Sequence, residues 1–473
     1  MKVWIATAGL VLLAVLAGLA LPVKAYMGLV AALVLLACVP ILFMFQIGNP
    51  FWGFALLVVT AVTFPLEFRG PSGVMMGSSF PLVTLLCGIW LLKIITIDRS
   101  EGLDRDRSVY AIVTFMGVAV LAFASGQYPW FPWDPAPLPA QVAELALFLL
   151  SGCLFLATAH QLNGFAQLRW LTWMFLAAGT LVCGMQVLSV QIGIVKWAIR
   201  PVSVGSLFWT WLVAVSFGQA LFNSRLSPWV RLGMLGITAM VFYHGLIQVR
   251  SWASGWIPAL IALGVILALR LPRTTIGLGL VSIPLGLFLM TQFSEFFMAD
   301  EEYSLMTRQE AWRVMWQLIE RSPVLGLGPA NYYYYTENVP LLGWYVRFIS
   351  HNNYEDLLAQ TGFLGLIAFC WVAFEILWLA WRVYLRAPAG FAQAYVVGGI
   401  GGIVGSLASG MLGDWIIPFY YNAGIIGFRS SLLFWVFTGT LLALKRIISA
   451  QEAATSGLTH FSRIRDRKLV QVA

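Results

Sequence analysis

Residues 108–125 read SVYAIVTFMGVAVLAFAS, a run without a single charged side chain. The run is continuously apolar, and similar runs recur along most of the chain. A helix needs about 20 apolar residues to cross a bilayer core of about 30 Å. Because these runs lack the alternation of barrel strands, and because a spanning segment must satisfy its own backbone hydrogen bonds, we expect helices.

The composition excludes a water-soluble fold. The chain has 473 residues, of which 60% are hydrophobic and 10% are charged, whereas about 25% of the residues in a soluble domain are charged. The 44 glycines and 21 prolines fit a polytopic bundle, where small residues allow close helix contacts. The net charge of +8 does not indicate a nucleic-acid partner, because the basic residues mark loop ends rather than a basic patch. Membrane lipids are the expected surroundings.

We therefore expect an all-α polytopic membrane protein with about 14 transmembrane helices (12–14), forming a single membrane domain over residues 1–473. The first run follows Met1 and Lys2 and is expected to be an uncleaved helix, because no small-residue cleavage site follows it. The expected spans are 3–21, 26–47, 51–66, 78–97, 108–125, 142–159, 170–194, 206–222, 229–247, 252–269, 274–293, 361–381, 393–413 and 422–444.

The distribution of basic residues predicts the orientation, because cytoplasmic loops of membrane proteins are enriched in lysine and arginine. With the segment 445–473 as a cytoplasmic tail and an even number of spans, both termini are cytoplasmic and 18 of the 28 basic residues lie inside. These residues are Lys2, Lys93, Arg99, Arg105, Arg107, Arg169, Arg225, Arg231, Arg270, Arg273, Arg382, Arg386, Lys445, Arg446, Arg463, Arg465, Arg467 and Lys468.

The longest connection, residues 294–360, then becomes an extracytoplasmic loop, and loops of this length are usually functional or disordered. Thr307 and Glu310 form a capping box. The apolar residues that follow at helical spacing predict an amphipathic helix that lies on the membrane or roofs a cavity; they are Trp312, Met315, Trp316 and Ile319, with Pro323 ending the helix. A second outer segment, 126–141, is rich in proline and is expected to be non-helical.

Arginines outside the expected cytoplasmic loops are candidates for a phosphate site. A cation at bilayer depth costs about 2.5–3.5 kcal/mol on insertion scales and usually marks a site. Guanidinium groups match phosphate oxygens bidentately, so a pyrophosphate is a suitable ligand. The alternative is that these arginines contact lipid headgroups or cap helices, and Arg429 could also pair with Asp414. The candidates are Arg200, Arg250, Arg308 and Arg429.

A histidine near the end of the long loop is the candidate base. His351 precedes an expected span in ISHNNYEDLLAQTG, with Tyr354 at i+3 and Glu355 at i+4. These residues could share a helix face, so that the carboxylate orients the imidazole. A neutral imidazole can accept a proton from a sugar hydroxyl near neutral pH. A structural histidine is the alternative. The nearby run Tyr332–Tyr335 fits either sugar stacking or interfacial packing.

Two blocks carry a family resemblance. HNNYEDLLAQTGFLGL, residues 351–366, resembles the histidine motif of the O-antigen ligase and polymerase superfamily, and RQEAWRVMWQLIERSPVLGLGPANY, residues 308–332, resembles the block that precedes it. LIQVRSWASGWIPALIALG resembles the family's Ser-Arg element, with Arg250 matching and Val249 in place of serine. Arg200 falls where the family often has an outer-loop arginine. The resemblance covers about residues 196–445.

The resemblance implies a metal-independent, inverting glycosyltransferase of the bacterial inner membrane, without a cofactor. It implies an undecaprenyl-pyrophosphate-linked glycan as donor and a glycolipid or glycan as acceptor. Arg250 and Arg308 would bind the pyrophosphate, and His351 would activate the acceptor hydroxyl. Topology adds Arg200 and Arg429 as supporting candidates.

The function leaves several alternatives open. The enzyme could act as a ligase, as a polymerase or in protein glycosylation. A transporter or flippase of a lipid-linked or amphipathic substrate would also need interior cations, but it predicts an internal repeat and broken helices near the bilayer midplane, which the sequence does not show. A scaffold would give no reason for Arg250, Arg308 and His351 to converge.

Overall fold

The computed structural model describes residues 48–63, 67–69, 75–77, 79–96, 103–188, 205–250, 252–273, 302–422 and 424–470. The expected spans 3–21, 26–47 and 274–293 lie outside these residues, as does Arg200. The helices are α3 (Phe51–Thr63), α4 (Ser79–Thr96), α5 (Arg107–Ser125), α6 (Leu138–Gln161), α7 (Phe165–Val187), α9 (Ser206–Phe222), α10 (Pro228–Tyr243), the π-helix η2 (His244–Gln248), α11 (Ala253–Arg270), α14 (Glu302–Ile319), α15 (Tyr332–Thr336), α16 (Asn353–Tyr384), α17 (Phe391–Gly410) and α18 (Gly424–Val470).

The all-α membrane fold is confirmed. Within the described ranges, nine helices are long and apolar enough to cross a bilayer, and α3 and α9 are shorter apolar helices. Each of the remaining expected spans coincides with one of these helices to within a few residues at most boundaries. The described strands are short, β1 (Glu67–Arg69) and β2 (Met75–Gly77), which pair antiparallel.

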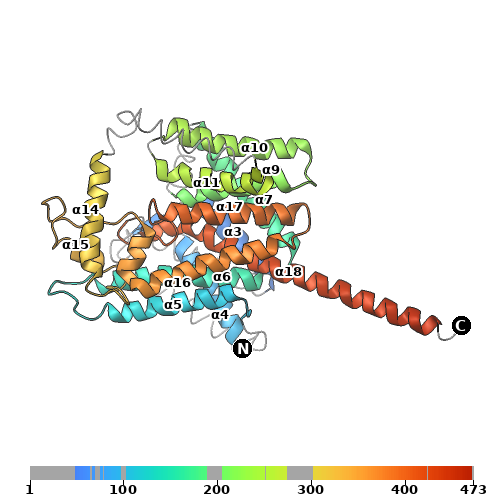
Figure 1. Cartoon of the computed structure of the whole chain (residues 1–473), viewed down its shortest axis with the longest axis horizontal. Coiled ribbons are helices and arrows are strands. Elements are labelled where there is room, and N and C mark those ends of the chain that lie inside the picture. Colours follow the sequence, from blue (N-terminus) through green and yellow to red (C-terminus); the bar gives the residue numbers. More distant parts are fainter. Residues whose placement is uncertain are drawn as a thin grey trace, which may run out of the picture.

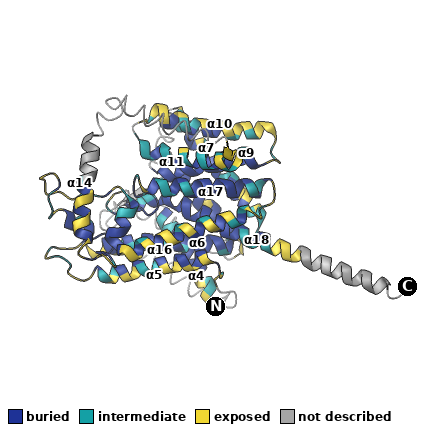
Figure 2. Ribbon diagram, in the orientation of Figure 1, coloured by how far each residue is buried: buried dark blue, intermediate teal, exposed yellow. Residues whose placement is uncertain are grey.

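The helices that could span a membrane run side by side, and α14 lies across one end of the bundle (Figure 1). At the opposite end α18 continues well beyond its neighbours (Figure 1). Because α18 runs to Val470, most of the segment expected as a tail continues this helix. Helix α17 is largely buried, whereas α10 is exposed along one side (Figure 2).

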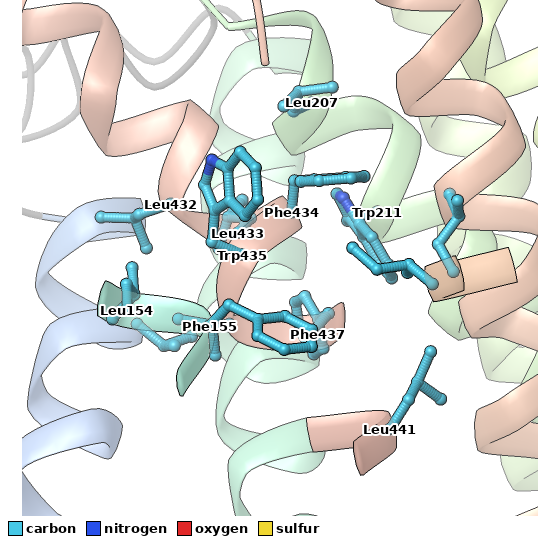
Figure 3. Close-up of a cluster of buried hydrophobic side chains, with 14 of the residues drawn as sticks. Leu154, Phe155, Leu207, Trp211, Leu432, Leu433, Phe434, Trp435, Phe437 and Leu441 are labelled. Carbon is cyan, nitrogen blue, oxygen red and sulfur yellow. The ribbon is translucent and has the colours of Figure 1, made fainter. Parts of the chain in front are cut away.

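The core is formed where α6, α9 and α18 meet (Figure 3). The rings of Trp211 and Phe437 stack with their centroids 4.9 Å apart. Glycines on α17 make this packing possible, since a Cβ atom at Gly402 would lie 2.6 Å from the Trp211 ring. A Cβ atom at Gly398 would likewise lie 2.7 Å from the carbonyl oxygen of Ala214 on α9. Small residues thus allow the close helix contacts expected of a membrane bundle.

Several basic residues that were predicted to lie on the same side of the membrane are found together at one end of the bundle. The buried carboxylate of Asp106 accepts hydrogen bonds from Arg382 at 3.0 Å and from Lys445 at 2.7 Å. Burial raises the pKa of Asp106, but the hydrogen bonds from Lys445 and Ser108 outweigh that effect and hold the pKa at about 2. Arg446 donates to the carbonyl oxygen of Ala159 at 2.8 Å. The ends of α5, α6, α16 and α18 are therefore tied together here.

The two expected outer segments meet at the opposite end. Ser125 donates to the carbonyl oxygen of Gly326 at 3.2 Å. The side chain of Asn331 donates to the carbonyl oxygens of Gly126 at 3.1 Å and Leu327 at 2.9 Å. It also accepts from the N–H of Ala136 at 3.1 Å. A single buried asparagine thus joins the proline-rich segment to the long loop.

The long loop is inserted into a break in α16. Gly362 has φ 65° and ψ −169°, so the helix ladder is interrupted there. Loop residues replace the lost hydrogen bonds on both sides of the break. The four bonds run from Phe363 N to Pro323 O (2.8 Å), Leu364 N to Val324 O (3.1 Å), Leu327 N to Ala359 O (2.8 Å) and Gly328 N to Gln360 O (3.0 Å).

Replacing Gly362 with alanine is expected to destabilise this joint. A Cβ atom there would lie 2.3 Å from the carbonyl oxygen of Val324, and only glycine adopts this backbone conformation readily. Such strain costs about 1–3 kcal/mol. Thermal unfolding of the detergent-solubilised protein should therefore begin at a lower temperature. Gly233→Ala is the control, because nothing lies within 4 Å of that position. Equal unfolding temperatures for the two variants would contradict the prediction.

Three expectations about the outer segments need correction. Helix α14 begins at Glu302, so the capping box at Thr307 is inside the helix rather than at its start; Leu305 and Met306, both strong helix formers, extend it. The buried face contains Met315 and Ile319, whereas Trp312 and Trp316 are exposed. The segment 126–141 ends in the first turn of α6, because a proline is tolerated at that position.

Candidate functional site

His351 stands in front of α16 rather than on it. Asn352 is the N-cap, and its side chain accepts a hydrogen bond from the N–H of Tyr354 at 3.0 Å. His351 is exposed and has φ 55°, a left-handed conformation that is uncommon for residues other than glycine. The expectation that His351 shares a helix face with Tyr354 and Glu355 is therefore wrong, because His351 lies outside the helix.

The residue before His351 is anchored by a buried carboxylate. The hydroxyl of Ser350 lies 2.7 Å from Oδ1 of Asp356, and the hydroxyl of Tyr332 donates to the same oxygen at 2.5 Å. Asp356 is buried, and the Tyr332 side chain is completely enclosed. Burial raises the pKa of Tyr332 well above its usual range, and the nearby Asp356 raises it further. Tyr332 is therefore a neutral donor that holds Asp356.

The loop between α17 and α18 packs against the residues that follow His351. The side-chain amide of Asn353 donates to the carbonyl oxygen of Ile417 at 2.7 Å and accepts from the N–H of Ile416 at 2.7 Å. This clamp fixes the start of α16 to a loop that is remote in sequence. It brings Asp414, in the same loop, into the neighbourhood of His351.

Asp414 is a buried acid at the site. It accepts hydrogen bonds from the N–H of Phe419 at 2.7 Å and from the side chain of Asn422. Burial raises the pKa of Asp414 above its usual value, and these hydrogen bonds and the nearby His351 offset only part of that effect. Within the described residues, Phe419 and Asn422 are the partners of Asp414, so the expected ion pair with Arg429 is not formed.

Arg250 borders the same loop. It lies in the turn between η2 and α11, is exposed, and its carbonyl oxygen accepts a hydrogen bond from Trp256 Nε1 at 3.2 Å. Trp252, at the start of α11, packs edge-on against Trp415 with ring centroids 6.1 Å apart. Because Trp415 adjoins Asp414, the turn that carries Arg250 lies at the same end of the bundle as His351.

The structure describes the remaining candidates, Arg429, Arg308 and Arg200, to different extents. Arg429 is 7% exposed in the first turns of α18 and donates from Nε to the carbonyl oxygen of Ala61 at 3.1 Å. Arg308 belongs to α14, whose backbone crosses the end of the bundle (Figure 1), and its side chain is outside the described set. Arg200 is outside the described residues. Gly205, the first described residue after it, packs against Ser430, next to Arg429.

The two supporting candidates have structural contacts. The carboxylate of Glu355 accepts a hydrogen bond from the Asn352 side chain at 3.0 Å, so it stabilises the N-cap. The hydroxyl of Tyr354 donates to the carbonyl oxygen of Leu407 on α17 at 2.7 Å. Both contacts hold the first turn of α16 in place and thereby position His351.

The tyrosine run divides into buried and half-buried members. Tyr332 and Tyr335 are buried, so their rings pack in the core. The ring of Tyr332 stacks on Phe419 at 4.7 Å, and that of Tyr333 stacks on Tyr421 at 4.4 Å. These stacks fasten α15 to the loop that carries Asp414.

The region around His351 and Arg250 is similar to a known protein family. Residues 212–370 match a family model described as O-antigen ligase. These residues are therefore similar to the O-antigen ligase family. The resemblance to the O-antigen ligase and polymerase superfamily is thereby confirmed. The matched range includes Arg250, Arg308 and His351, whereas Arg200 and Arg429 lie on either side of it. No curated protein matches the chain significantly.

The family match and the membrane-spanning helices give the general class. The protein is a multi-pass membrane protein. The family match supports O-antigen ligase-like glycosyltransferase activity in general terms. The O-antigen ligase family implies a lipid-linked glycan and an acceptor in the membrane as substrates.

Proposed function

We propose that the protein transfers a glycan from undecaprenyl pyrophosphate to an acceptor hydroxyl at the outer face of the bacterial inner membrane. The observation that carries this proposal is the conformation of His351. It is an exposed histidine with φ 55°, at the same end of the bundle as Arg250 and beside the buried Asp414. A non-glycine residue held in this conformation must be supported by its surroundings, and such residues cluster at functional sites.

The proposed reaction is a displacement at the anomeric carbon. The neutral imidazole of His351 takes the proton of the acceptor hydroxyl, and the hydroxyl oxygen attacks the anomeric carbon from the side opposite the pyrophosphate. The bond between that carbon and the pyrophosphate oxygen breaks, so the configuration inverts. The negative charge of Asp414 stabilises the imidazolium that forms.

The arginines are proposed to receive the leaving group. Arg250 and Arg308 would hold the pyrophosphate and stabilise the charge that grows on it as the bond breaks. Arg200 and Arg429 would add positive charge nearby. The guanidinium of Arg429 already lies in the membrane-embedded part of the fold, bound through Nε to Ala61. This arrangement would keep the diphosphate at the end of the bundle while the lipid remains in the bilayer.

Reconstitution distinguishes transfer from transport. Purified protein in liposomes is given a polyprenyl-diphosphate glycan and an added acceptor. New glycosyl-acceptor, detected by mass spectrometry, supports the enzyme. Movement of unchanged donor across the bilayer without a new bond supports a transporter or flippase instead. Ligase and polymerase activities are separated by the glycolipid that accumulates in a deletion strain, since a ligase leaves complete lipid-linked polymer and a polymerase leaves single repeat units.

Chelation tests the proposed metal independence. Because the guanidinium groups of the arginines already neutralise the pyrophosphate, the reaction needs no divalent cation. The rate of transfer should therefore be unchanged, within about twofold, after removal of divalent cations with excess EDTA. The matched measurement adds back Mg²⁺ or Mn²⁺ to the treated protein. Loss of the activity on chelation and its recovery on addition of a cation would refute this part of the proposal.

A further inference from the structure

A tight turn of unusual composition lies in the long loop between α15 and α16. Leu341 and Trp344 form an antiparallel bridge in which each N–H donates to the other's carbonyl oxygen at 2.9 Å. The two central residues, Leu342 and Gly343, have φ of 50° and 87°. This is the backbone of a two-residue hairpin turn, where asparagine or aspartate followed by glycine is usual. A leucine in this conformation is strained.

The turn presents an apolar and aromatic surface to solvent. Trp344 is 73% exposed and Tyr345 is 67% exposed. Leu342 and Val346 are also exposed. Burial of such side chains would be favourable by about 25 cal/mol for each Å² of apolar surface removed from water. The backbone bridge holds the turn in one shape, so little conformational entropy would be lost when something covers it.

Charged groups flank this surface and fix its base. The guanidinium of Arg347 lies 4.0 Å from the ring centroid of Tyr334 on α15, and its Nε donates to Glu337 at 2.5 Å. The side chains of Arg347 and Glu337 are 38% and 47% exposed, so each can form further hydrogen bonds. Tyr334 in turn packs against Tyr421 with centroids 5.6 Å apart. The turn is therefore attached to the loop that carries Asp414.

The location of the turn favours a ligand in the aqueous phase. Figure 1 shows α14 and α15 beyond the ends of the spanning helices, with the loop that follows α15 extending away from the bundle. This is the end opposite Asp106 and its basic partners, and the chain reaches His351 seven residues after Trp344. An aromatic ring beside planar polar side chains matches a sugar, whose C–H face stacks on the ring and whose hydroxyls bind the polar groups.

We propose that the turn of residues 341–347 is an oligosaccharide-binding subsite that holds sugar residues beyond the reacting one. This inference rests on the proposed glycan transfer, because it names what lies next to His351. Trp344 and Tyr345 supply the stacking faces, and Arg347 and Glu337 supply the hydrogen bonds. The bound glycan belongs either to the donor or to the acceptor, and the chemistry of recognition is the same for both.

Direct binding tests the subsite without requiring catalysis. Full-length protein in nanodiscs of phosphatidylethanolamine and phosphatidylglycerol is titrated with two water-soluble probes from the producing strain. One is glycan released by mild acid from the lipid-linked donor pool, and the other is glycan released from the envelope acceptor. The Trp344→Ala/Tyr345→Ala double variant should bind one of these probes about tenfold more weakly, because two stacking contacts are lost. The probe whose affinity falls identifies the source of the glycan.

The controls separate stacking from folding. Trp344→Phe should retain most of the affinity, because an aromatic face remains. Trp229→Ala removes a tryptophan that is 80% exposed at the start of α10, at the other end of the bundle, and should bind like the unchanged protein. Binding is also measured with His351→Ala, to show that binding of the probe does not depend on the catalytic base. Unchanged affinity of the double variant for both probes would overturn the proposal.

Discussion

Replacing His351 with alanine is expected to slow glycan transfer by about 10²–10⁴-fold, the usual contribution of a positioned general base. Ser350 and Asn352, which hold the backbone on either side, keep their contacts, so the fold should persist. The exposed position of His351 also means that its removal leaves no buried cavity. The measurement is the initial rate of glycosyl-acceptor formation in liposomes, with the amount of folded protein determined by size-exclusion chromatography.

His460→Ala is the control for this experiment. Residue 460 lies on the extension of α18 at the opposite end of the bundle, so its replacement should leave the transfer rate unchanged. Surface polysaccharide in cells gives a second measurement for both variants. A His351→Ala protein that reaches the membrane in normal amounts and still transfers at the full rate would remove His351 as the base.

Replacing Arg308 or Arg250 with lysine is expected to reduce the turnover number by about 10²–10³-fold, as in the loss of a group that stabilises charge in the transition state. Lysine keeps the positive charge but cannot form the bidentate fork, so the apparent affinity for the donor should fall less than the turnover number. The two quantities are obtained by varying the concentration of a polyprenyl-diphosphate donor at a saturating concentration of acceptor.

Helix α14 supplies a matched control for the arginine variants. Arg313 lies on the same helix, is 51% exposed, and pairs with Glu310 at 2.6 Å. This local ion pair lowers the pKa of Glu310. Arg313→Lys should therefore leave transfer close to that of the unchanged protein. If the Arg308 and Arg313 variants lost activity to the same extent, the charge of α14 as a whole would matter and a specific pyrophosphate contact would not.

The spanning helices could be predicted from sequence because apolar length alone decides them. The run 108–125 became α5 (Arg107–Ser125), and 206–222 became α9 with the same bounds. Prediction was less accurate at the end of the bundle that carries the long loop, where residues face neither lipid nor water alone. The apolar pattern of α14 did not show that Met315 would be buried while Trp312 stayed exposed, since the buried face depends on what the helix covers.

The site was only partly visible in the sequence. His351 stood out because histidines are scarce and this one lies beside a motif. Asp356 and Tyr332 were missed as its supports, since their hydrogen bond joins residues 24 positions apart and depends on how the loop folds back. Asp414 was noticed, but with the wrong partner. Its nearness to His351 arises from the clamp formed by Asn353, which no sequence spacing encodes.

The joint between the loop and the break in α16 restricts how substrates can reach His351. Lifting residues 323–328 away from α16 would uncover four backbone donors and four acceptors at once. Each such buried group costs about 1–3 kcal/mol when its partner is removed. Residues 323–328 are therefore expected to stay attached to α16 and not to open during the reaction. A lipid-borne donor should then reach His351 laterally from the bilayer rather than through an opening between residues 323–328 and α16.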